Sequence, residues 1–84
     1  MTYDSDHADD NGLEIDLEMV REDLIGELQA INQYQEHIDS IEDEEAIRVL
    51  EHIRDDEKEH VAELTRLIQQ LDATQAEKFK KEGL

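Results

Sequence analysis

Cysteine is absent from the sequence. Disulfide bonds are therefore excluded, and so are zinc sites built on thiolates and a rubredoxin-type iron centre within this chain. No apolar run approaches the roughly 20 residues that a membrane-spanning helix needs. The first residues, Met1 to Asp6, lack the basic and then apolar pattern of a signal peptide. We therefore expect a cytoplasmic protein with no membrane partner.

Basic side chains are also scarce. The chain has 8 Lys and Arg against 25 Asp and Glu, which gives a formal net charge of -17 at pH 7. Because phosphate recognition needs clusters of Lys and Arg, we expect neither nucleic acid nor an anionic membrane as a partner. Such acidity is typical of halophilic proteins, which are adapted to high salt, and it also draws cations toward a protein. The two interpretations are compatible.

Two stretches carry hydrophobic residues at alternating steps of three and four, which is the spacing of a buried seam along a helix. The first seam consists of Leu17, Val20, Leu24, Glu27, Ile31, Tyr34, Ile38 and Ile41. The second seam consists of Leu50, Ile53, Glu57, His60, Leu64, Leu67 and Leu71. Ionisable ligand-type residues interrupt each seam at its centre.

The seams predict an all-α fold built on a helical hairpin over residues 13–72. We expect the first helix over about residues 13–40. Gly26 inside it would mark close approach by another backbone, since an internal Gly costs about 1 kcal/mol relative to Ala. Asp43 is a good N-cap for a second helix over about residues 44–71. So short a link makes the two helices antiparallel neighbours.

The two ends of the chain carry weaker signals. Residues 1–12 are acidic and lack periodicity, which predicts a disordered tail. After Asp72, the sequence Thr74-Gln75-Ala76-Glu77 fits a capping box. It predicts a short third helix to about Lys81, within a C-terminal segment 73–84 that Phe79 would anchor.

The interruptions of the seams point to a bound metal. Glu57 and His60, at positions i and i+3, share one face of the second helix, and counting along the hairpin brings Glu27 to the same level. Burying an ionised carboxylate without a partner costs on the order of several kcal/mol, and neither seam contains Lys or Arg. We therefore predict that Glu27, Glu57 and His60 bind a metal. Tyr34, two turns after Glu27, would either reach this metal or pack as a core aromatic residue.

One hairpin supplies half of a ligand set found in helical bundles. Di-iron carboxylate sites use a Glu from each of two helices and a Glu-x-x-His from each of two others. A symmetric homodimer would supply that set within a four-helix bundle, and its four carboxylates would balance two Fe²⁺ ions. One imidazole for each metal suits iron or manganese better than catalytic zinc, which more often has two or three His ligands.

Two runs of residues resemble the encapsulated ferritins, which are half-length members of the ferritin and rubrerythrin superfamily. They are Glu27-Leu28-Gln29-Ala30-Ile31-Asn32-Gln33-Tyr34 and Arg54-Asp55-Asp56-Glu57-Lys58-Glu59-His60. The resemblance, which covers about residues 15–80, implies that Glu27, Glu57 and His60 bind iron at a two-fold dimer interface near Tyr34. It implies ferroxidase activity, the oxidation of Fe²⁺ with O₂. It further implies that dimers assemble into a decamer within an encapsulin shell that stores the iron mineral.

The chain departs from that family at three places. Gln33 stands where an aromatic residue often precedes the tyrosine. Gly26 and Gln29 stand where family members can carry acidic residues through which the metal enters. The last residues, Lys81 to Leu84, do not resemble the apolar tail with which free-standing members dock on the shell.

Two other functions fit the same residues. A rubrerythrin-like peroxide reductase would use the same metals, but without Cys its electron donor would have to be another protein. A structural helical dimer would use the seam carboxylates only to fix its register. Such a dimer would need no metal.

Overall fold

The chain folds into three helices. The structure is a computed structural model that describes residues 2–84, with the side chains of residues 12–84. Helix α1 spans Thr2–Ser40, α2 spans Glu44–Leu71 and α3 spans Ala73–Lys81, and this part of the chain contains no strand. The all-α fold class is therefore confirmed. No described helix is both long and apolar enough to cross a membrane.

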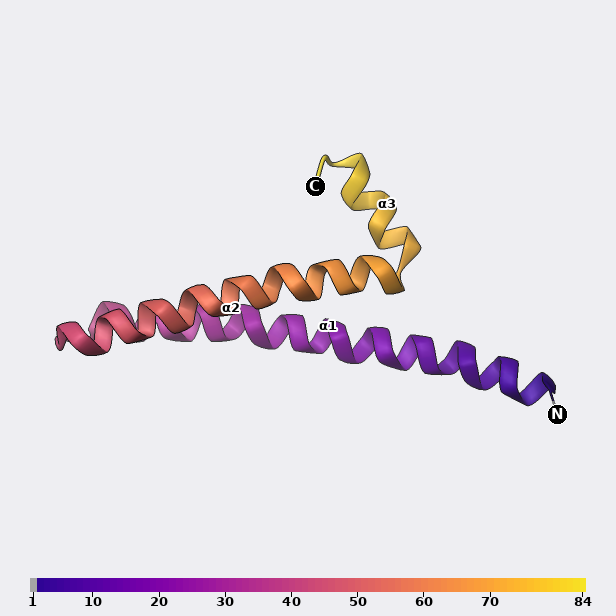
Figure 1. Cartoon of the computed structure of the whole chain (residues 1–84), viewed down its shortest axis with the longest axis horizontal. Coiled ribbons are helices and arrows are strands. Elements are labelled where there is room, and N and C mark those ends of the chain that lie inside the picture. The colour runs from indigo at the N-terminus through magenta and orange to yellow at the C-terminus, as the bar shows by residue number, and fades with distance from the viewer. Residues whose placement is uncertain (1) are drawn as a thin grey trace.

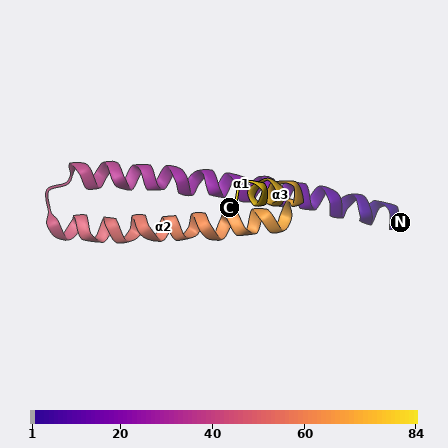
Figure 2. The same cartoon turned by 90° about the horizontal axis from the view of Figure 1, so that it is seen from above.

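Helices α1 and α2 form the predicted antiparallel hairpin. Figure 1 and Figure 2 show the two helices running alongside each other from the short link between them. The carboxylate of Asp43 accepts a hydrogen bond from the Ala46 N–H at 2.8 Å, so Asp43 is the N-cap of α2, as predicted. Glu44 and Glu45 occupy the first turn of α2, where the helix dipole favours negative charge.

Helix α3 leaves the hairpin at an elbow formed by Asp72 (Figure 1). The Asp72 N–H donates to the Ile68 carbonyl oxygen at 2.8 Å, and its carboxylate accepts the Gln75 N–H at 3.1 Å. The same carboxylate pairs with Arg21 of α1 at 2.8 Å. The predicted capping box with Thr74 as its cap was wrong, because Asp72 directly follows α2 and Asp is a stronger N-cap than Thr.

Phe79 of α3 faces the end of the hairpin across a cavity, and its role as the anchor of α3 stays a prediction. Its half-buried ring lines a cavity of about 260 Å³ together with Leu24 of α1 and Ile68 of α2. Residues of all three helices line this cavity, which lies at the end of the hairpin opposite the link between α1 and α2.

The start of α1 differs from the prediction. The helix begins at Thr2 instead of near Leu13. The sequence contains no Pro, and Gly12 is the only Gly before the first seam, so little in the backbone would stop a helix there. The side chains of residues 1–11 lie outside the described part, and the predicted boundary at residue 12 stays a prediction.

A single chain leaves large hydrophobic residues of its described part exposed, most of them outside the two seams. Among residues 12–84, Ile68 is the only buried hydrophobic residue, with 5% of its surface exposed. The exposed large hydrophobic residues are Leu13, Ile15, Met19, Ile25, Leu28, Val49, Leu67 and Leu84. The elongated shape, with extents of 62 × 31 × 14 Å, explains this exposure, because a lone hairpin covers only one side of each helix.

Candidate metal centre

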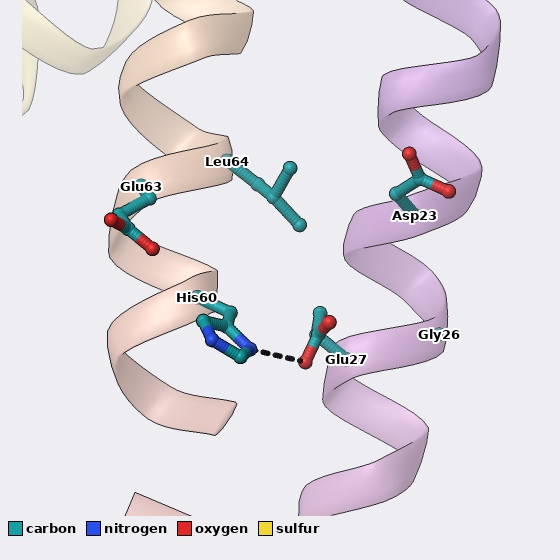
Figure 3. A pocket seen from close by; sticks show the side chains of 6 residues that line it. All are labelled: Asp23, Gly26, Glu27, His60, Glu63 and Leu64. Atoms are coloured by element: carbon teal, nitrogen blue, oxygen red, sulfur yellow. Dashed lines mark ion pairs between the residues drawn. The ribbon is translucent and has the colours of Figure 1, made fainter. Parts of the chain in front are cut away.

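The metal ligands predicted from the sequence lie together midway along the hairpin. Nδ1 of His60 lies 3.5 Å from Oε2 of Glu27 and 3.7 Å from Oε2 of Glu57. One ligand atom from each residue lies within 4.8 Å of the other two. Figure 3 shows Glu27 on α1 and His60 on α2 pointing toward each other. Atoms that share one ion at about 2 Å lie about 3 to 4 Å apart, so small side-chain shifts would close the cluster around a metal.

The carboxylates of the cluster are more buried than its imidazole. The side chains of Glu27 and Glu57 are 25% and 18% exposed, whereas that of His60 is 47% exposed. Oε2 of Glu27 is a buried oxygen that has no hydrogen-bond partner among the described residues. Leaving such an atom unsatisfied costs about 1 to 3 kcal/mol, and more when the group is charged.

No Lys or Arg neutralises this cluster from within the described residues. The ion pairs of Arg21, Arg48 and Arg54 all lead to other carboxylates. A cation held by Glu27, Glu57 and His60 would satisfy the orphaned oxygen of Glu27. The donor set therefore fits the metal that the sequence predicts.

A cavity of about 480 Å³ adjoins the cluster and is bordered by Glu27 and His60 (Figure 3). Asp23 and Glu63 also line it, although neither was predicted to lie at the site. Their spacing could have revealed them, because Asp23 lies four residues before Glu27 and Glu63 lies three residues after His60. Acidic side chains thus stand one turn from two of the ligands.

Gly26 borders the same cavity. A Cβ atom built on it would have no neighbour within 4 Å. The close approach of another backbone that we predicted at Gly26 is therefore not found within one described chain. Gly26 instead leaves the wall of the cavity beside Glu27 without a side chain.

Tyr34, His37 and His52 stand apart from the cluster. Tyr34 is half-buried, but it is neither part of the ligand cluster nor a lining residue of the cavity. Its place beside the metal stays a prediction. His52 pairs with Asp56 at 3.3 Å in an exposed position, and His37 is exposed.

Comparisons with known proteins agree with these features. The sequence profile of the EncFtn-like family matches residues 5–82. The encapsulin nanocompartment cargo protein EncC of Myxococcus xanthus (strain DK1622) is 44% identical over 57 residues. The aligned part covers 68% of this chain and 44% of that relative, so the chain spans less than half of the relative's length.

Proposed function

This chain belongs to the EncFtn-like family, and we propose that it is a ferroxidase subunit whose di-iron site forms between two copies. The observation that carries the proposal is the unpartnered, buried Oε2 of Glu27 beside Glu57 and His60. Each copy would contribute these three ligands. Fe²⁺ is the substrate, and the two ions together supply two electrons for the reduction of O₂.

The exposed side of α2 supports the role of a second copy. Val49, His60 and Leu67 are separated by three turns and two turns, so they form one stripe along the helix. Val49 and Leu67 are 47% and 37% exposed, and the side chain of His60 is 47% exposed. A hydrophobic stripe centred on a metal ligand suits a second hairpin, which would cover the aliphatic residues and complete the ligand set.

The residues of the chain have separate tasks in this proposal. Glu27 and Glu57 balance the positive charge of iron in a partly buried site, and His60 supplies a neutral nitrogen ligand. Asp23 and Glu63 add negative potential beside the cavity, which favours the arrival of Fe²⁺. Tyr34 would lie near the reacting ions, as the family resemblance implies.

The proposal extends to assembly and storage. A four-helix bundle has no closed interior for a mineral, so storage of the oxidised iron requires a surrounding partner. The relative from Myxococcus xanthus is a cargo protein of an encapsulin nanocompartment, and this likeness supports an encapsulin shell as the partner of this chain. Ile25 and Leu28, 53% and 48% exposed on α1, offer apolar surface for joining dimers into a larger ring such as a decamer.

Native mass spectrometry during anaerobic addition of Fe²⁺ to metal-stripped protein tests the proposal. We expect about one iron for each chain, bound only by even-numbered assemblies, followed by O₂ consumption on exposure to air. Glu57→Ala should abolish both signals. Glu59→Ala, an exposed Glu on the same helix, is the matched control and should abolish neither.

Two results would contradict the proposal. Dimers that form without metal and take up no iron would identify the seam carboxylates as devices that fix the register of a structural dimer. Iron uptake by single chains would remove the need for a shared site.

A further inference from the structure

We propose that Arg54 and Gln35, named here the Arg54 clamp, position Glu57 for metal binding by fixing the rotation of α2 against α1. The inference rests on the proposed metal centre and adds positioning residues to it. Nη1 of Arg54 donates a hydrogen bond to Oε1 of Gln35 on α1 at 2.9 Å. Nε of Arg54 donates to Oδ1 of Asp55 at 3.1 Å, and Nη2 lies 3.1 Å from the same oxygen.

The clamp is the only side-chain hydrogen bond that joins α1 to α2 in the part of the chain that the structure describes. The other link from α1, between Arg21 and Asp72, reaches the elbow beyond the end of α2. Among the described residues, His60 of α2 also lies 3.5 Å from Glu27 of α1, but this contact belongs to the ligand cluster that has to be positioned. The seam on either side of it is mainly aliphatic, and aliphatic contacts have no directional preference. The hydrogen bond between the planar groups of Arg54 and Gln35 therefore fixes the rotation of α2 relative to α1, which the aliphatic contacts of the seams do not fix.

Helix geometry places the clamp beside Glu57 and away from the open side of the centre. Arg54, Glu57 and His60 follow one another by three residues, so neighbouring side chains are displaced by about 60° around α2. Glu57 lies in the middle, between Arg54 and His60. The side chain of Arg54 is 18% exposed and that of His60 is 47% exposed. Arg54 therefore lies on the less exposed edge of α2, and His60 lies on the more exposed edge.

Small rotations of α2 would spoil the ligand cluster. A rotation of about 10° moves an atom that lies about 6 Å from the helix axis by about 1 Å, whereas productive sites hold their groups to within about 0.5 Å. Glu57 and His60 would both move relative to Glu27, because both lie on α2. The Arg54 clamp opposes this rotation one turn from Glu57.

The charge of Arg54 is directed away from the metal ligands. Its ion pair is with Asp55, and it forms none with Glu27 or Glu57. A cation paired with either Glu would compete with a metal, so an Arg that served the site as a counter-charge would weaken it. Positioning is therefore the task that the observed contacts assign to Arg54.

The test measures Co²⁺ binding to the metal-free full chain by titration and by the visible spectrum, which reports the geometry of the ligands. Gln35→Ala removes the acceptor of the clamp without changing charge. Arg54→Lys keeps the charge but loses the planar, multidentate donor. Both should weaken Co²⁺ binding about tenfold and shift the visible bands, as loss of outer groups that orient metal ligands does.

Further variants separate a loss of ligand positioning from a general loss of protein stability. Combining Gln35→Ala with Arg54→Lys should cost no more than the larger single effect, because both break the same bond. Gln35→Glu retains an acceptor and should keep the wild-type spectrum. Gln33→Ala, at an exposed position on the same helix, is the matched control and should leave both affinity and spectrum unchanged.

Wild-type affinity and spectrum in both Gln35→Ala and Arg54→Lys would overturn the inference, as would an equal loss in Gln33→Ala. If Gln35→Ala does not fold, Arg54→Lys decides by the same criteria. A wild-type protein that binds no Co²⁺ and no Fe²⁺ would refute the metal centre and the clamp together. Binding that is indifferent to the clamp would refute the clamp alone.

Discussion

Asp72 at the elbow and Glu57 at the centre of the hairpin have side chains that are 19% and 18% exposed, so solvent reaches the two carboxylates to the same extent. Their partners differ. Asp72 accepts the Gln75 N–H and pairs with Arg21. Among the described residues, the imidazole of His60 is the only basic group beside Glu57 and its neighbour Glu27, at 3.7 and 3.5 Å. A carboxylate that stabilises the fold has its partners within the chain, whereas one that binds a ligand is left short of them.

Among the variants that test this contrast between the elbow and the metal centre, Glu27→Gln should have the largest effect. The amide keeps the shape of the side chain but loses its charge. We expect at least about 100-fold weaker Fe²⁺ binding, since changes to outer groups alone cost about 10- to 100-fold. In the metal-free protein the unfolding midpoint should rise or stay constant, because an uncompensated charge has been removed. Anaerobic calorimetry and thermal unfolding measure the two effects.

Glu36→Gln provides the control for this variant, because Glu36 is exposed on the same helix. It should change neither iron affinity nor the midpoint. Unchanged iron affinity in Glu27→Gln would remove Glu27 from the site. A lower midpoint for the metal-free variant would show that the carboxylate already has a stabilising partner.

Asp72→Ala should have the opposite signature. Loss of the N-cap of α3 costs about 1 kcal/mol, and loss of the partly exposed pair with Arg21 adds up to about 1 kcal/mol. Chemical denaturation should therefore show a free energy of unfolding lower by about 1 to 2 kcal/mol. Co²⁺ affinity should stay within about twofold of wild type, since Asp72 is not a ligand.

Arg21→Ala separates the two contributions of Asp72, because it removes the ion pair and leaves the cap. It should cost less than Asp72→Ala. A large loss of Co²⁺ affinity in either variant would mean that the elbow and the centre are coupled, and the contrast between them would then fail.

Gly26→Ala should have the smallest effect on stability, and it tests whether the space beside Glu27 is needed. A Cβ atom at this position has open space in the described chain. Alanine should therefore stabilise α1 by about 0.5 to 1 kcal/mol in dilute, metal-free protein. Thermal unfolding measures the gain, with Gln29→Ala on the exposed surface as the comparison. A midpoint that falls instead at high protein concentration would show that the partner's backbone needs the space beside Glu27.

Periodicity was sufficient to predict the hairpin and the ligand cluster. The second seam included the exposed Leu67 and missed the buried Ile68. The steps of three and four otherwise identified the inward side of each helix, and the Asp43 cap fixed where α2 begins. From these two facts it followed that Glu27 lies level with Glu57 and His60. The contact between Glu27 and His60 confirms that level.

Contacts that depend on side-chain reach could not be predicted in this way. Arg54 lies beside the seam and reaches Gln35 through a long side chain whose stem can be buried while its end remains polar. The elbow was missed because Asp72 serves α2, α3 and Arg21 at once, whereas the local pattern at Thr74 described only one of these contacts. Sequence spacing shows which residues share a face, but not which pairs meet across two helices.

Ile68 is the only buried hydrophobic residue among residues 12–84. This small core has a consequence for how folding depends on protein concentration. Under the proposed function, a chain that buries so little hydrophobic surface gains much of its free energy of folding from the second copy, and mass action then sets the fraction that is folded. Dilution should lower the unfolding temperature, and added iron should raise it. Low concentrations of either the chain or iron would therefore leave a larger fraction of the protein unfolded. The stability of the protein thus increases with the concentrations of chain and iron.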